Sequence, residues 1–238
     1  GRVLFSTAAV AFLGLGLPAR AQNLPGEVRS LQKISDTDGG FTDTLPDGIK
    51  FGTSQCMIGD VDGDGTVDMA VGTPLGASGG TNRGAVWVVL LNPDRTVKAF
   101  HKIDDSSGDL PNALVDFDQF GVSMAPVGDL DSDGIPDLAV GANGNSALLT
   151  GAVYVLFLNA DGIVDHGQRI DNSNGSLPVT LDLFDQFGVS LSADGPGKLF
   201  VGAIGDDDGG ADRGALYRIQ LDSTGSVTGS VLKIGSTA

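Results

Sequence analysis

One sequence unit occurs three times in this chain, and the repetition limits the possible folds more than any other feature. Each unit has a Phe-Gly pair, a turn that opens with Gly, and a Gly-Ala pair that leads into an apolar stretch. The Phe-Gly pairs begin at Phe51, Phe120 and Phe187; the turns begin at Gly72, Gly141 and Gly202; the Gly-Ala pairs begin at Gly84, Gly151 and Gly214. A repeated module of this length buries its apolar side chains by stacking on its neighbours. We therefore expect an array of similar modules.

Each unit contains four short apolar stretches whose length and β-branched content favour strands over helices. In the second unit they span 120–127, 138–141, 152–158 and 164–170. In all three units, 17 positions separate the Ile that ends one strand from the next Phe-Gly pair, which indicates a structured crossover. These features predict an all-β fold, a partial β-propeller of four-stranded antiparallel blades, with about three blades and the start of a fourth unit. A stacked sandwich array is the alternative, but it gives no reason for a constant crossover.

The repeats divide the chain into five segments. Residues 1–21 have an early Arg, an apolar run and a small-residue cleavage pattern, which predict a signal peptide. An outer strand, Val28–Ile34, and the first blade occupy 22–96, and the second and third blades occupy 97–163 and 164–226. Residues 227–238 are expected to supply the outer strand of the third blade, Val227–Ile234, and to begin a further unit. Because three blades do not close a ring, we expect an incomplete propeller with an exposed apolar flank that favours self-association.

Two loops share the pattern Asp-x-Asp-x-Asp-Gly-x-x-Asp, and we expect each to hold one Ca²⁺. Acids at positions 1, 3 and 5 point into such a loop, the Gly at position 6 permits a sharp turn, and position 7 can offer its carbonyl. An EF-hand is excluded because position 12 is Val in both loops and the flanks have strand character. An ordinary acidic turn is the alternative. The predicted ligands are Asp60, Asp62, Asp64, Thr66 and Asp68 in the first loop, and Asp129, Asp131, Asp133, Ile135 and Asp137 in the second.

The third unit lacks this loop. The short sequence Asp194-Gly195-Pro196-Gly197 replaces it, and Lys198 aligns with the last acid, Asp137. The loss of the ligands and the added positive charge predict that this blade binds no calcium.

These motifs resemble the FG-GAP repeats of the integrin α-subunit β-propeller and of related bacterial proteins. The resemblance covers about residues 28–238, and it implies a propeller with calcium in the hairpin loops between the first two strands of a blade. The third blade departs from it by losing its calcium loop. The family includes adhesion receptors and domains attached to enzymes, so the resemblance leaves the type of ligand open.

Composition narrows the function further. The net charge is −16 and the sequence has no basic stripe, which argues against nucleic-acid binding. The apolar run near the N-terminus is too short for a convincing membrane span. A single cysteine, Cys56, excludes an internal disulfide and is expected to be buried and inert. His101 and His166 are the only histidines, and their positions give no nucleophile constellation.

We therefore expect a secreted or cell-surface calcium-binding module for adhesion or ligand binding. A protein or glycan ligand is expected on the face opposite the calcium loops. Acids concentrate there, at Asp104, Asp105, Asp109, Asp206, Asp207, Asp208 and Asp212. Solvated acidic loops without a ligand are the alternative interpretation of these residues. Two other functions stay open: an accessory or catalytic propeller of an extracellular hydrolase or lyase, and a purely structural array.

Overall fold

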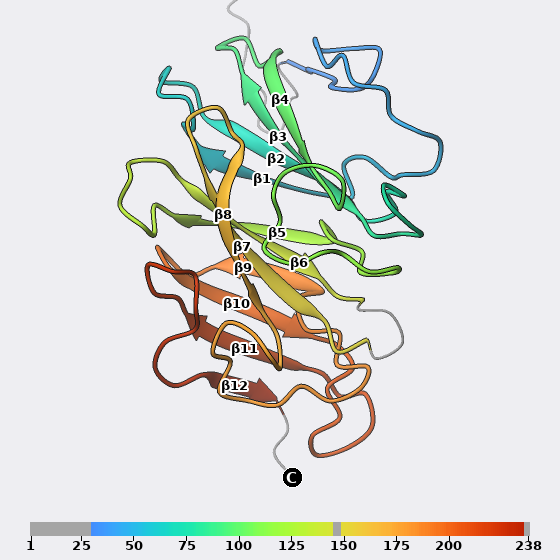
Figure 1. Ribbon diagram of the computed structural model, residues 1–238, viewed down its shortest axis with the longest axis vertical. Helices are drawn as coiled ribbons and strands as arrows, with labels where there is room; N and C mark the ends of the chain where they lie inside the picture. The colour runs from blue at the N-terminus through green and yellow to red at the C-terminus, as the bar shows by residue number, and fades with distance from the viewer. Residues whose placement is uncertain (1–29, 145–148, 236–238) are drawn as a thin grey trace, which may run out of the picture. The chain divides into compact units, whose positions relative to one another are not determined.

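A computed structural model describes residues 30–144 and 149–235, and every regular element in these ranges is a β-strand. Twelve strands form three separate four-stranded antiparallel sheets, drawn in Figure 1. The all-β prediction of four-stranded blades is thereby confirmed. The predicted signal peptide, 1–21, lies outside the described residues.

The strands of each sheet follow one another in the order of the chain, as in a meander. Sheet 1 contains β1 (Ser54–Gly59), β2 (Asp68–Thr73), β3 (Ala85–Leu91) and β4 (Val97–Ile103). Sheet 2 contains β5 (Ser123–Gly128), β6 (Asp137–Ala142), β7 (Ala152–Leu158) and β8 (Val164–Ile170). Sheet 3 contains β9 (Ser190–Ala193), β10 (Lys198–Ala203), β11 (Ala215–Gln220) and β12 (Leu232–Gly235). We call these sheets blades 1, 2 and 3.

The outer strand of each blade comes from the start of the next sequence unit. Strand β4 pairs with β3, β8 with β7, and β12 with β11. The third closing strand is shorter than the predicted Val227–Ile234, because Gly229 adopts a positive φ of 73° and only Val227 forms a bridge, to Leu221, before the strand begins. The predicted outer strand Val28–Ile34 stays a prediction: its described residues, 30–34, are paired with none of the twelve described strands, and the blade it was predicted to complete is not one of the three described.

An aromatic side chain occupies the same place in every blade. Trp87, Tyr154 and Tyr217 lie on the third strands, and each meets the Phe of its own Phe-Gly pair edge to face, with ring centroids 5.3–5.7 Å apart. A cation from the outer strand covers each ring: Lys102, Arg169 and Lys233, respectively, at 5.2–5.6 Å. All three rings are buried, so this repeated packing places them in the core of the array.

The second and third Phe-Gly pairs join blades 2 and 3 to the blade before each of them. Phe120 forms a parallel bridge to Gly84, and Phe187 forms the equivalent bridge to Gly151. The glycine of the Phe187-Gly188 pair completes the contact, because its carbonyl oxygen accepts a hydrogen bond from the Ser123 hydroxyl at 2.7 Å. The same oxygen would lie only 2.0 Å from a Cβ atom added to Gly141. Gly72 has the same relation to the carbonyl of Gly121, at 2.2 Å. Glycine is needed here because two backbones touch.

The crossovers between blades are ordered by local hydrogen bonds, as their constant length predicts. Asp104 Oδ1 accepts the amides of Ser106 and Ser107, and Asp171 Oδ1 accepts those of Ser173 and Asn174, all at 2.8–2.9 Å. The second crossover also docks on blade 1, where the amide of Phe117 donates to the carbonyl of Thr81 at 2.8 Å. The end opposite the Asp-rich loops is thus a defined surface.

Candidate metal centres and the opposite face

The first Asp-rich loop, between β1 and β2, is wound around its own carboxylates. Asp60 accepts the amides of Asp64 and Gly65 at 3.1 and 2.9 Å. Asp62 accepts the amide of Asp64 at 3.2 Å, and Asp64 accepts the amide of Thr66 at 2.8 Å. Positive φ angles at Gly63 and Gly65 allow this tight path.

The second loop, between β5 and β6, repeats these contacts one for one. Asp129 accepts the amides of Asp133 and Gly134 at 3.1 and 3.0 Å. Asp131 accepts the amide of Asp133 at 3.2 Å, and Asp133 accepts the amide of Ile135 at 2.8 Å. The same nine-residue pattern therefore folds in the same way in two different blades.

The last acid of each loop is buried and ties the loop to the neighbouring hairpin. Asp68 is fully buried and accepts the amides of Val61 and Leu91 at 2.9 and 2.8 Å. Asp137 likewise accepts the amides of Leu130 and Leu158, at 2.8 and 3.3 Å. Burial raises the pKa of both carboxyls, that of Asp137 to about 7, and nearby loop acids add to the effect. A nearby cation would favour the charged forms.

Three carboxylates converge in each loop. One oxygen from each of Asp60, Asp62 and Asp68 lies within 4.8 Å of the others, and Asp129, Asp131 and Asp137 form the matching group. Asp64 and Asp133 lie outside these groups of three. Hard oxygen donors gathered in this way fit a calcium ion. The ligand roles of Asp64 and Asp133, and of the carbonyls of Thr66 and Ile135, stay predictions.

Blade 3 closes the same hairpin without a buried carboxylate; the one acid of its turn, Asp194, pairs with Arg218 at 2.6 Å. The amide of Leu221, which corresponds to Leu91 and Leu158, donates to the carbonyl of Gly197 at 2.7 Å. Pro196 packs near Gly128 of blade 2, much as Pro136 packs near Gly59 of blade 1. Lys198 begins β10 at the place where Asp137 begins β6, as the alignment predicts. A backbone carbonyl has replaced the buried carboxylate.

The opposite face contains three acids that are occupied within the protein. Asp104 is buried and pairs with Lys102 at 2.7 Å; burial alone would raise its pKa, but bonds from Lys102, Ser78 and Ser106 hold the pKa well below the ordinary value. Asp105 pairs with Arg83, and Asp206 accepts the Tyr217 hydroxyl and pairs with Lys233, both at 2.6 Å. The expectation that these three acids face a ligand is therefore wrong. Exposed acids of the predicted set are Asp109, Asp207, Asp208 and Asp212.

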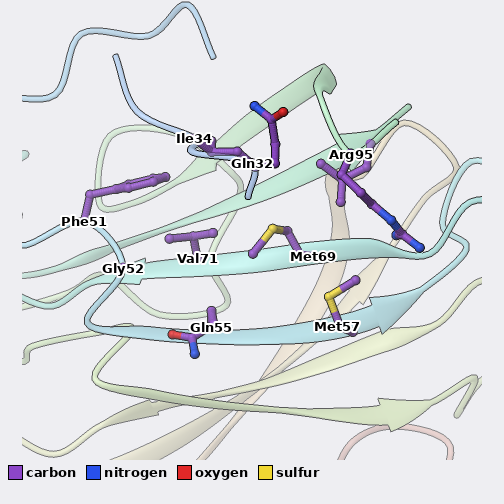
Figure 2. A pocket seen from close by; sticks show the side chains of 10 residues that line it. Gln32, Ile34, Phe51, Gly52, Gln55, Met57, Met69, Val71 and Arg95 are labelled. Carbon is purple, nitrogen blue, oxygen red and sulfur yellow. The ribbon is translucent and has the colours of Figure 1, made fainter. Parts of the chain in front are cut away.

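An apolar hollow of about 440 Å³ opens on the side of blade 1 away from blade 2. Figure 2 shows Gln55 and Met57 on β1 beside Met69 and Val71 on β2, with Ile34 nearby. The corresponding positions of blade 2 are covered, because Val140 and Tyr154 belong to the core shared with blade 1. The hollow is therefore a sheet face of the kind that packs between blades elsewhere in this protein.

The described side chains present no nucleophile next to a histidine. His166 contacts Asp165 at 3.0 Å and stacks on Phe157. Cys56 is half-buried, not fully buried as predicted, and burial raises the pKa of its thiol to about 12, which suits an inert side chain. In the parts of the chain that the structure describes, no helix is long and apolar enough to cross a membrane.

Comparison with known proteins agrees with the repeats and the blades. The FG-GAP repeat family matches residues 53–89, 120–156 and 183–219. Integrin alpha-IIb of Homo sapiens is 29% identical over 170 residues, which is 71% of this chain and 16% of that protein. Integrin alpha-5 of Xenopus laevis is 32% identical over 57% of this chain, which is 11% of that protein. Integrin alpha-V of Gallus gallus is 26% identical over 90% of this chain, which is 21% of that protein.

The class of protein follows from these matches together with the three blades. The chain is an FG-GAP repeat protein, similar to the integrin α-subunits. It spans about a fifth or less of the length of these relatives.

Proposed function

We propose that this protein is a calcium-stabilised binding or adhesion module that acts outside the cell, secreted or on the surface. The observation that carries the proposal is the convergence of three carboxylates in each of two loops. Blade 3 shows that the hairpin closes through a backbone carbonyl alone, so the fold does not require this concentration of negative charge. Repulsion among the acids opposes the folded loop, and a bound divalent cation offsets that repulsion.

Calcium has two roles in this proposal. It binds the folded protein at two sites, Asp60–Asp68 and Asp129–Asp137, and so stabilises blades 1 and 2. It also fixes the β1–β2 and β5–β6 hairpins, which meet through Pro136 and Gly59. Calcium is structural here, and ligand binding is assigned to the other end of the blades.

The proposed ligand surface is formed by the connections at the end opposite the calcium loops. Exposed acids there include Asp109, Asp207 and Asp212, and exposed apolar side chains include Phe117, Phe184 and Ile204. Surfaces that combine charge with isolated apolar groups suit a protein or a glycan ligand. The resemblance to integrin α-subunits supports a protein ligand first.

The ligand surface is tested with a panel of immobilised extracellular-matrix proteins and glycans. The probe is the purified chain in calcium, wild type or with Asp207→Asn and Asp212→Asn combined. We expect a saturable ligand whose affinity falls at least tenfold in the variant, while Asp161→Asn, on the end with the calcium loops, leaves it unchanged. Equal binding by all three proteins would place the ligand elsewhere.

Self-association is proposed for the apolar hollow of blade 1. Met57 is 47% exposed at its rim, and such a face favours contact with another apolar surface. Sedimentation of the wild type and of Met57→Glu tests this: the variant should be more monomeric at equal concentration. An unchanged distribution would contradict it.

A further inference from the structure

The two candidate calcium loops have the same backbone but different electrostatic surroundings. The Lys98 ammonium lies 2.7 Å from Asp62 Oδ2 and 2.6 Å from Asp64 Oδ2, so it bridges two acids of the first loop. No described cationic side chain forms an ion pair with an acid of the second loop. One loop therefore has a cation of its own, and the other does not.

The difference has its origin in the outer strands. Val97 pairs with Leu91 at the start of β4, and Val164 pairs with Leu158 at the start of β8, so the next residues, Lys98 and Asp165, occupy equivalent positions. Both are exposed, while the valines before them are buried. Asp165 contacts His166 at 3.0 Å. The same position thus carries a positive charge beside the first loop and a negative charge in the second blade.

We infer that Lys98 acts as a tethered competitor for calcium in the first loop, so that the two centres have unequal affinities and the second loop fills first. The inference rests on the proposed calcium function. Calcium must displace the ammonium from Asp62 and Asp64 or tolerate a like charge a few ångströms away, and either effect weakens binding. The Lys98 side chain is 40% exposed and can turn to solvent, so it weakens the first site without abolishing it. Lys198 in blade 3 differs because it replaces a ligand position outright.

Because their affinities differ, the two loops would fill in different ranges of calcium concentration. Blade 2 would be fixed at low calcium, and the loop of blade 1 would respond as calcium rises further. Because the Lys98 ammonium is partly exposed, added salt screens its charge and should reduce the difference in calcium affinity between the two sites.

The test measures calcium affinity by calorimetry with one loop disabled at a time. In the Asp131→Ala background only the first loop remains, and Lys98→Met, which keeps the aliphatic stem, should tighten binding about tenfold. In the Asp62→Ala background only the second loop remains, and Asp165→Lys should weaken binding by a similar factor. Lys33→Met, which removes an exposed charge paired with Asp38, is the matched control and should change neither site.

The outcomes separate this inference from the proposed function. Two sites of equal affinity, or a first site that Lys98→Met does not tighten, would overturn the role of Lys98 and leave the calcium function standing. No calcium binding to the wild-type chain would overturn both. Circular dichroism of each variant checks that the blades are intact, and a second charge-removing variant, Lys98→Gln, must agree with Lys98→Met.

Discussion

Blades 1 and 2 close their first hairpin with carboxylates, whereas blade 3 closes it with backbone. Asp68 and Asp137 accept the amides of Leu91 and Leu158, and the carbonyl of Gly197 takes that place for Leu221. The prolines that pack against the preceding blade serve both kinds of hairpin. The comparison separates what the fold needs from what a cation would need: a hydrogen-bond acceptor and a packed turn suffice for the fold, and our proposal assigns the additional acids to a metal ion.

The largest expected effect is on blades 1 and 2 when calcium is removed. Binding to the native state alone contributes about 2.7 kcal/mol per site at a calcium concentration of 100 Kd, or about 5 kcal/mol for two sites. The melting temperature should therefore fall by roughly 10 °C or more in chelator. Asp131→Ala should remove part of this difference, and Asp194→Ala, in the turn of blade 3, should leave it unchanged. Identical melting curves with and without calcium would contradict the account.

Gly141, at the contact between blades 2 and 3, can be compared with Gly202, the equivalent glycine of blade 3, where no described blade follows. A Cβ on Gly141 would lie 2.0 Å from the carbonyl oxygen of Gly188, which cannot move without separating the blades. Gly141→Ala should therefore lower the free energy of unfolding by about 3 kcal/mol. At the equivalent Gly202 the nearest atom is the rotatable Ser190 hydroxyl, at 2.2 Å, so Gly202→Ala should cost less than about 1 kcal/mol. Urea denaturation measures both, and equal losses would show that the contact between blades is not the cause.

The crossover between blades 2 and 3 contains an acid, Asp185, whose burial makes the stability of the protein depend on pH. Burial raises the pKa of Asp185 from 3.8 to about 6, so the folded state holds a proton that the unfolded state has lost between these values. Stability should therefore decrease as pH rises from 4 to 6, by at most about 1.4 kcal/mol per pH unit. Asp185→Asn should flatten this part of the profile in saturating calcium. If Asp185→Asn keeps the wild-type slope of unfolding free energy against pH, the pH dependence belongs to other groups.

The smallest effect is expected at the prolines that both kinds of hairpin share. Pro196 lies 3.3 Å from where a Cβ on Gly128 would be, and Pro136 lies 2.7 Å from the same point on Gly59. Pro196→Ala and Pro136→Ala should each cost about 0.5–1 kcal/mol, through lost packing and a more flexible unfolded chain. Similar losses, measured by denaturation in calcium, would support one shared role. A much larger loss for Pro136→Ala would show that its contact depends on the metal loop.

Much of the fold was predictable because its signals are local in sequence. The repeats predicted the blades, and the glycine spacing predicted the turns. The nine-residue pattern predicted the loop that brings Asp60, Asp62 and Asp68 together. The exact outer strand of blade 3 was not predictable from apolar content, since Gly229 delays it.

The misassigned and missed residues depend on partners far away in sequence. Asp206 looks like a free surface acid until Tyr217 and Lys233 are brought to it by β11 and β12. Lys98 gives no motif signal, and only the pairing of β4 with β3 places it near acids more than 30 positions earlier. Asp105 was misassigned for the same reason, because Arg83, 22 positions earlier, pairs with it in the folded chain. Asp104 is different: its partner Lys102 is close in sequence, and what the sequence did not reveal is that Asp104 is buried.

Calcium stoichiometry tests the central claim most directly. Native mass spectrometry of the wild-type chain, titrated with calcium, should show two bound ions. Asp62→Ala and Asp131→Ala should each leave one ion, the double variant should leave none, and Asp194→Ala should leave both. Calcium binding that is absent from the wild type, or that persists in the double variant, would contradict the assignment of these two loops.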